Sequence, residues 1–184
     1  MSLTRFKASD LICFLEAIDR NLDEAAQMTV IGGSAAALGY KVAIATVDID
    51  TYSSNLELIH VAAVVARTET GLEIPLSNTP IADVPYNYED RLVRVLPRLE
   101  KLQVWVLEKH DLALSKIMRA AQHDLQQLTE LHGVTPLELP VLVNRYKEEM
   151  DHVIGQSAVI RLQFLLLLEA LWGVSVADAV DATL

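Results

Sequence analysis

The chain of 184 residues carries 25 acidic and 15 basic side chains, a net charge of −10, and 52% of it is hydrophobic. This composition excludes intrinsic disorder, and the charge argues against broad nucleic-acid binding, which needs many Lys and Arg contacts. The single cysteine, Cys13, excludes an internal disulfide framework; no signal peptide is visible, and the longest apolar run, Phe164–Leu168, is too short to span a membrane. We therefore expect a cytoplasmic protein without a membrane partner.

The first half of the chain alternates helical and strand patterns. Apolar residues at helical spacing predict the first helix, whose Cys13 is expected to be buried in the protein core. A short buried strand follows. A short alanine-rich helix is expected to end at Gly39. In the helix expected over 55–67, we predict that Val64 lies on the apolar face that turns towards the core. The predicted elements are helices over 10–25, 34–38 and 55–67 and strands over 28–31 and 46–49.

Four prolines make residues 73–97 largely loop, with a short helix near Tyr88. Strands over 92–96 and 102–107 could pair as a hairpin. Beyond them only helices are expected, over 111–131, from Thr135-Pro136, over 151–172 and over 174–180. The chain is thus predicted to be α/β, with a short mixed sheet flanked by helices and an all-helical C-terminal region. Its domains would be 1–110 and 111–184, or one continuous core.

Gly32, Gly33 and Ser34 follow the first strand, and Asp48-Ile49-Asp50 begins fourteen residues after the serine. A strand that breaks into Gly-Gly-Ser and opens a helix presents backbone N–H groups to a phosphate. A second strand ending in Asp-x-Asp points both carboxylates the same way, because side chains alternate along a strand. Together these groups predict a divalent cation, Mg²⁺ or Mn²⁺, that carries a nucleotide's phosphates.

A second polar group lies on the helix expected after Asp111. Lys116 and Arg119 are three residues apart and share a helix face, and Asp124 follows about two turns after Lys116. A lysine near the start of a helix that follows a buried strand could reach a triphosphate. The alternative is an ordinary exposed lysine with helical salt bridges.

Three segments carry a resemblance to a known group of enzymes. They are Ile31-Gly-Gly-Ser-Ala, Thr46-Val-Asp-Ile-Asp, and Asp111-Leu-Ala-Leu-Ser-Lys with Arg119 and Asp124. They resemble the signature of minimal nucleotidyltransferases of the polymerase-β-like superfamily, in particular uncharacterised bacterial families related to abortive-infection nucleotidyltransferase toxins. The resemblance covers residues 26–131. It implies transfer of a nucleoside monophosphate from an NTP to a hydroxyl; in the toxin relatives the acceptor is RNA or protein.

The resemblance also implies roles for single residues. Members typically carry a third carboxylate on a later strand, for which only Glu73 and Glu108 are candidates here. The implied set is Asp48 and Asp50 as catalytic metal ligands, Gly32, Gly33, Ser34 and Lys116 as phosphate contacts, and Glu73, Glu108, Arg119 and Asp124 as accessory residues.

Two other readings of the chain stay open. Thr29-Val-Ile-Gly-Gly-Ser resembles the opening of a dinucleotide-binding domain, with Asp50 as the ribose-binding acid, but Ser34 replaces the second glycine and further βαβ units are missing. The other reading is a catalytically inactive module, such as an antitoxin, whose apolar C-terminal helix contacts a second copy or a partner chain. A third carboxylate near Asp48 and Asp50 would favour the enzyme.

Overall fold

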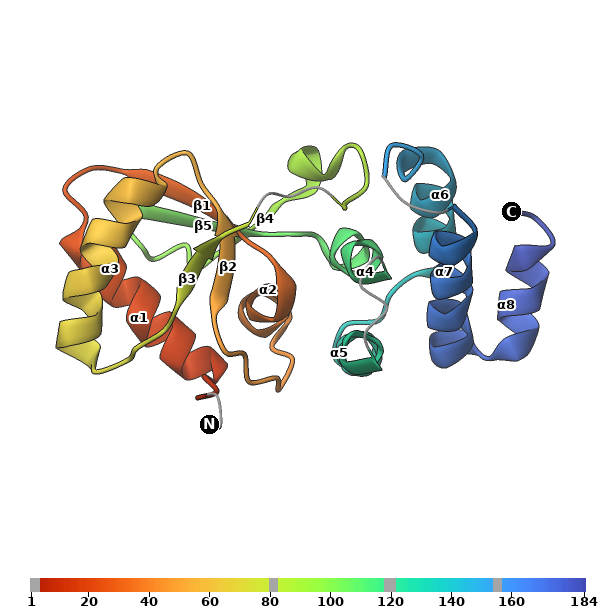
Figure 1. Ribbon diagram of the computed structural model, residues 1–184, viewed down its shortest axis with the longest axis horizontal. Coiled ribbons are helices and arrows are strands. Elements are labelled where there is room, and N and C mark those ends of the chain that lie inside the picture. The colour runs from red at the N-terminus through yellow and green to blue at the C-terminus, as the bar shows by residue number, and fades with distance from the viewer. Residues whose placement is uncertain (1–3, 80–82, 118–121, 154–156) are drawn as a thin grey trace. The chain divides into compact units, whose positions relative to one another are not determined.

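The computed structural model describes residues 4–79, 83–117, 122–153 and 157–184. The chain forms two compact units. The first consists of Met1–Ile81 and Leu92–Leu107, and the second of Ala82–Arg91 and Glu108–Leu184. The first unit contains a sheet with helices, and the described elements of the second are helices only (Figure 1). The predicted α/β class with a helical C-terminal region is therefore confirmed. None of the described helices is both long and apolar enough to cross a membrane.

The sheet of the first unit is mixed and has five strands in the order β3-β2-β1-β5-β4 (Figure 1). β1 runs parallel to β5 and antiparallel to β2, while β3 is parallel to β2 and β4 antiparallel to β5. The predicted hairpin is thus the β4–β5 pair. The strands are β1 Ala26–Val30, β2 Ile49–Tyr52, β3 Leu76–Asn78, β4 Val93–Val95 and β5 Leu102–Val106.

Three helices cover one face of this sheet: α1 Ala8–Asn21, α2 Gly32–Tyr40 and α3 Leu56–Thr70. α1 packs against both α2 and α3, and each of the three helices contacts a central strand. Alternate residues of each strand face these helices. The side chains of these residues in the central strands are fully buried and apolar. They include Met28, Val30, Val104 and Val106.

Gly39 allows α2 to lie close to β5. A Cβ atom at this position would lie only 2.8 Å from Cγ2 of Val106. The expectation that Gly39 ends the helix is wrong, since α2 continues to Tyr40 and the left-handed residue after it is Lys41, with φ of 56°. Packing against the sheet therefore requires this glycine, and helix termination does not.

The second strand is displaced from its predicted position at 46–49. β2 begins at Ile49, and Asp48 lies in the bend before it. Because β2 is antiparallel to β1, its first residues lie beside the last residues of β1. The Asp-x-Asp segment thus straddles the start of a strand, and does not end one. β3 escaped prediction because it is three residues long and mostly exposed.

Two side-chain expectations in the first unit are wrong. Cys13 is exposed, and so is Val64, whose predicted inward place on α3 is taken by Ala66. Apolar residues occur all round α3, so the helical period alone does not determine which face turns inward.

The described part of the second unit holds one short 3₁₀ helix and five α-helices. Within the segment predicted as one helix over 111–131, the structure describes α4 and α5; residues 118–121 lie outside the described residues. The prediction that Thr135-Pro136 opens the next helix is wrong. α6 begins at Leu139, and the backbone amides of Leu137 and Glu138 before it donate to the rings of His132 and His110. The elements are η1 Tyr88–Arg91, α4 Lys109–Ile117, α5 Gln122–Val134, α6 Leu139–Glu149, α7 Ser157–Trp172 and α8 Val174–Asp181.

Candidate functional site

The first candidate feature is the N-terminus of α2, which opens directly at the end of β1. Ile31 is extended, and the next residue, Gly32, has φ of 67°, a left-handed conformation that glycine adopts at little cost. The first amides of a helix have no carbonyl partner one turn earlier. The turn from Gly32 to Ser34 therefore offers backbone donors to an anion, in the place where the helix dipole also favours one.

Asp50 lies beside this turn. The Ile31 amide donates to the Asp50 carbonyl at 2.9 Å, which extends the β1–β2 pairing by one residue. The Oδ2 atom of Asp50 lies 3.5 Å from the position of a Cβ on Gly32, and its Oδ1 accepts the Thr79 hydroxyl at 3.3 Å. The structure thus brings together Gly32 and Asp50. It also adds Thr79, which no sequence spacing indicated because β3 was not predicted.

Ser34 occupies a different environment from the one expected. Its side chain is 2% exposed, and its hydroxyl donates to the Ile31 carbonyl at 3.1 Å. This bond stabilises the first turn of α2. The Ser34 hydroxyl could donate to a phosphate only if its bond to Ile31 broke. The backbone amide of Ser34 could donate to a phosphate while that bond stays intact.

Asp48 lies at the entrance to β2 and is partly buried. The Thr46 hydroxyl donates to its backbone carbonyl at 3.1 Å. Thr46 and Phe6 exchange two backbone hydrogen bonds, of 2.7 and 3.0 Å, which attach this loop to the segment before α1. Thr46 therefore attaches the bend that carries Asp48 to the N-terminal segment.

The donor chemistry of this site fits a hard divalent cation. Mg²⁺ takes oxygen ligands and is commonly held by one or two carboxylates together with substrate phosphates. Asp50 supplies such a carboxylate next to the helix turn, and Asp48 precedes it by two residues in the bend before β2. Within the described ranges no group of three or more His, Cys, Asp or Glu side chains could hold a metal ion. Glu73, a candidate third acid, is exposed in the loop before β3.

In the second unit, Lys116 is engaged inside the helical core. It is 5% exposed, and its ammonium donates to Asp124 Oδ1 at 2.8 Å and to Gln127 Oε1 at 2.7 Å. The contact joins α4 to α5, so the spacing of Lys116 and Asp124 brings them together across two helices. Arg119 lies outside the described residues.

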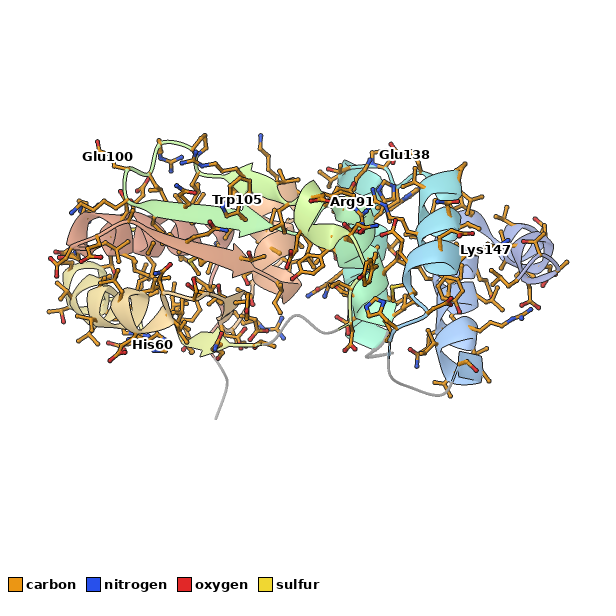
Figure 2. All side chains as sticks on the ribbon, turned by 90° about the horizontal axis from the view of Figure 1, so that it is seen from above. His60, Arg91, Glu100, Trp105, Glu138 and Lys147 are labelled. Carbon is orange, nitrogen blue, oxygen red and sulfur yellow. The ribbon has the colours of Figure 1, made fainter. Side chains whose placement is uncertain are left out.

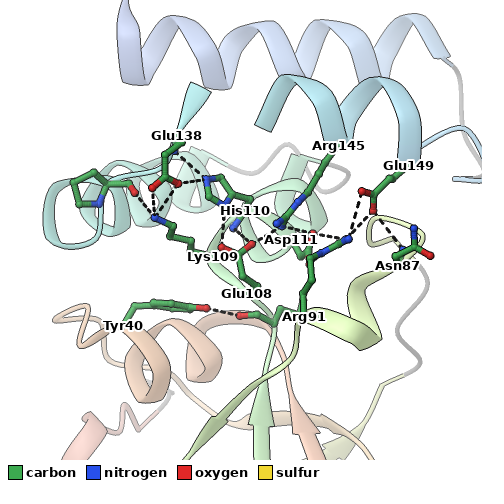
Figure 3. A network of polar contacts seen from close by, with 12 residues as sticks. Tyr40, Asn87, Arg91, Glu108, Lys109, His110, Asp111, Glu138, Arg145 and Glu149 are labelled. Carbon is green, nitrogen blue, oxygen red and sulfur yellow. Dashed lines mark hydrogen bonds and ion pairs between the residues drawn. The ribbon is translucent and has the colours of Figure 1, made fainter. Parts of the chain in front are cut away.

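A larger polar network surrounds the start of α4 (Figure 3). Asp111 is fully buried and accepts from Arg91 at 2.9 and 3.1 Å and from Arg145 at 2.8 Å. Arg91 also donates to Glu149 at 2.7 Å. Burial alone would lower the pKa of Arg91, but the hydrogen bonds to Asp111 and Glu149 raise it above its ordinary value. Asp111 therefore anchors two arginines from distant segments.

Glu108, the other candidate third acid, belongs to the same network. It accepts from Arg145 and, at 2.8 Å, from His110 Nδ1 (Figure 3). Burial would raise the pKa of Glu108, but the hydrogen bonds from His110 and Arg145 outweigh burial and lower it to about 2. Sequence reasoning missed Arg91 and Arg145 because they lie far from their common partner Asp111 in the chain and belong to no local motif.

Comparison with known proteins gives one match. The model of a family described as "Nucleotidyltransferase of unknown function (DUF6036)" matches residues 8–166. The chain matches no curated protein and no solved structure. The matched segment contains the α2 turn, both aspartates of the β2 entrance, and Lys116.

Proposed function

Because the chain belongs to a family of nucleotidyltransferases of unknown function, we propose that it transfers a nucleoside monophosphate from an NTP to a hydroxyl acceptor. The proposal includes a divalent cation, Mg²⁺ or Mn²⁺, held by Asp48 and Asp50. The observation that carries it is the placement of the Asp50 carboxylate 3.5 Å from where a Cβ on Gly32 would be.

The charges at this place support a metal–nucleotide complex. Phosphates bound to the amides of Gly32, Gly33 and Ser34 would lie beside the carboxylate of Asp50. Two anionic groups at such close range repel each other in a partly desolvated site. A divalent cation between carboxylate and phosphate removes the repulsion, and the nucleotide's own oxygens complete its coordination.

In the proposed reaction the acceptor oxygen bonds to the α-phosphorus, the bond to the β-phosphate oxygen breaks, and pyrophosphate and the acceptor's proton are released. The α2 turn holds the phosphates and aligns the α-phosphorus, which is the main protein contribution in phosphoryl-type transfers. Asp48 and Asp50 would hold the metal, which supplies charge stabilisation when bound. Thr79 orients the Asp50 carboxylate through its hydroxyl.

The remaining predicted residues have weaker support. Lys116 stays a predicted phosphate contact, and its ammonium is bound to Asp124 and Gln127 in the structure. Glu108 is bound by Arg145 and His110, and Glu73 is exposed. We therefore propose the reaction with the protein carboxylates of Asp48 and Asp50 alone.

Titration calorimetry of the full chain with each of the four NTPs, with and without Mg²⁺, tests the binding step. Asp50→Asn and Asp48→Asn should each abolish Mg²⁺-dependent binding without unfolding the protein. Asp23→Asn is the matched control, since Asp23 is exposed at the opposite end of β1. Equal binding by wild type and both site variants, or no binding by the wild type, would overturn the proposal.

Incubation of the protein with labelled NTPs and cell extract tests the transfer step. Label that reaches RNA, protein or a small molecule identifies the acceptor class. Mg²⁺-dependent NTP binding without any transfer would favour the inactive partner-binding module, for example a member of a toxin–antitoxin pair.

A further inference from the structure

One row of side chains crosses four strands on the sheet face opposite the helices. Thr29 of β1 pairs with Tyr52 of β2 and with Trp105 of β5, and Trp105 pairs with Arg94 of β4. Directly paired residues of neighbouring strands share a face. Tyr52, Thr29, Trp105 and Arg94 therefore form a continuous line across the sheet, here called the aromatic row.

The aromatic row lies on the same face as Asp50. Asp50 precedes Tyr52 by two residues on β2, so both side chains point to the same side of the sheet. α1, α2 and α3 pack on the other side, against residues such as Val104 and Val106. Within the described part of the first unit, no helix covers the aromatic row.

The side chains of the aromatic row are suited to bind a ligand that carries an aromatic ring and an anionic group. Tyr52 is 50% exposed, and Arg94 is exposed with neither an ion pair nor a hydrogen bond among the described residues. Trp105 is only partly exposed, and its Nε1 atom is buried without a hydrogen-bond partner in the described part of the chain; Figure 2 shows this residue on β5. Aromatic rings stack nucleobases and arginine binds phosphate.

The next row along the strands is polar and uncharged. Gln27 pairs with Gln103, and both are exposed. Their amides could hydrogen-bond the edges of bases. In a chain with a net charge of −10, the two rows hold one arginine and no carboxylate. The surface is thus complementary to an anionic ligand that carries aromatic rings.

The length of the row indicates more than one nucleotide. Three steps between strands of about 4.8 Å separate Tyr52 from Arg94 by about 14 Å, whereas Tyr52 is about 7 Å from Asp50 along β2. An NTP with phosphates on the α2 turn could place its base near Tyr52. It has no second ring for Trp105 and no further phosphate for Arg94, while a nucleotide chain has both.

From these observations we infer that the aromatic row binds the end of a single-stranded nucleic acid, whose terminal hydroxyl is the acceptor. The acceptor role rests on the proposed function, but the binding does not. One arginine gives few phosphate contacts, so the affinity is modest and depends on stacking. This local surface is compatible with the absence of broad nucleic-acid binding expected from the overall charge.

Fluorescence anisotropy with the full chain and a 5′-fluorescein-labelled oligouridylate of eight nucleotides, without NTP, tests this inference. Tyr52→Leu and Trp105→Leu should each weaken binding by about tenfold or more, because each removes one stacking platform. Arg94→Gln should lower the salt slope of log Kd by about 0.7, the value for one lost phosphate contact.

Two matched variants serve as controls. Arg20→Gln makes the same charge change on α1, in the helical layer, and Tyr86→Leu removes an exposed tyrosine of the second unit. Both should bind like the wild type. If Trp105→Leu fails to fold, the exposed side chains of Tyr52 and Arg94 still decide the question.

Several outcomes would overturn the inference: no oligonucleotide binding by the wild type, unchanged binding in the row variants, equal losses in the controls, or transfer of the labelled nucleoside monophosphate to protein and not to nucleic acid. Calorimetry with Mg²⁺–NTP separates the two proposals. A wild type that binds NTP without the oligonucleotide retains the proposed function and loses this inference. A wild type that binds the oligonucleotide through the row but binds no NTP retains the inferred nucleic-acid binding and loses the proposed function.

Discussion

The Oδ2 atom of Asp50 lies 3.5 Å from the position that a Cβ on Gly32 would occupy. Gly32 opens α2 and Asp50 lies at the start of β2, so the antiparallel β1–β2 pairing brings an acidic side chain to a helix N-terminus. The helix end favours an anion and the carboxylate favours a cation. The pair therefore supports binding of a metal–nucleotide complex.

Gly32→Ala should impair both stability and nucleotide binding. At φ of 67° an alanine costs about 1–2 kcal/mol, and its methyl group would lie against Asp50. We expect Mg²⁺-dependent NTP binding to weaken by about tenfold, or 1.4 kcal/mol. Gly71→Ala is the matched control, because Gly71 has φ of 69° and open space around it. Calorimetry should show normal binding for Gly71→Ala; normal binding for Gly32→Ala would contradict the prediction.

Gly39→Ala should destabilise the first unit by about 1–3 kcal/mol, the usual cost of overpacking, since its Cβ would lie 2.8 Å from Val106 Cγ2. In a Val106→Ala background, Gly39→Ala should lower the free energy of unfolding by less. A double-mutant cycle from urea denaturation measures this difference. Gly133→Ala on α5, with open space around it, should instead stabilise by up to about 1 kcal/mol. Strictly additive effects of the Gly39 and Val106 substitutions would argue against the contact.

Glu108 should make the second unit sensitive to acid. Its pKa of about 2 lies below the ordinary value of 4.5, so its stabilisation is complete above about pH 4.5 and is lost as the pH falls towards 2. The difference corresponds to at most about 3 kcal/mol. Glu108→Gln should flatten this part of the pH dependence of the free energy of unfolding. Glu148→Gln, at an exposed position of α6, should leave the wild-type profile unchanged; identical profiles for both variants would refute the role.

Lys116→Met should cost about 3–5 kcal/mol, the range for removing one partner of a buried ion pair, because it leaves Asp124 without its ammonium partner. Lys147→Met should cost only about 1 kcal/mol, since its hydrogen bonds to Thr183 are exposed. Thermal or urea unfolding gives both values. If Lys116→Met kept full stability but lost NTP binding, the lysine would serve the ligand and not the helical core.

Local sequence patterns were enough to name part of the candidate site. Gly32, Gly33 and Asp50 could be named from a strand followed by glycines and from alternating acids. Thr79 could not, because β3 becomes a strand only by pairing with β2. Arg91 and Arg145 were likewise missed, since their common partner Asp111 joins segments that no spacing relates.

By itself, the sequence determined the α/β class, the helical C-terminal region and the glycine turn between β1 and α2, because hydrophobic period and glycine chemistry are local properties of the chain. Only the tertiary structure decided that β2 starts at Ile49, that Gly39 serves packing against Val106, and that Tyr52, Trp105 and Arg94 share one row. Those outcomes depend on strand order and register, which arise from contacts between residues distant in sequence.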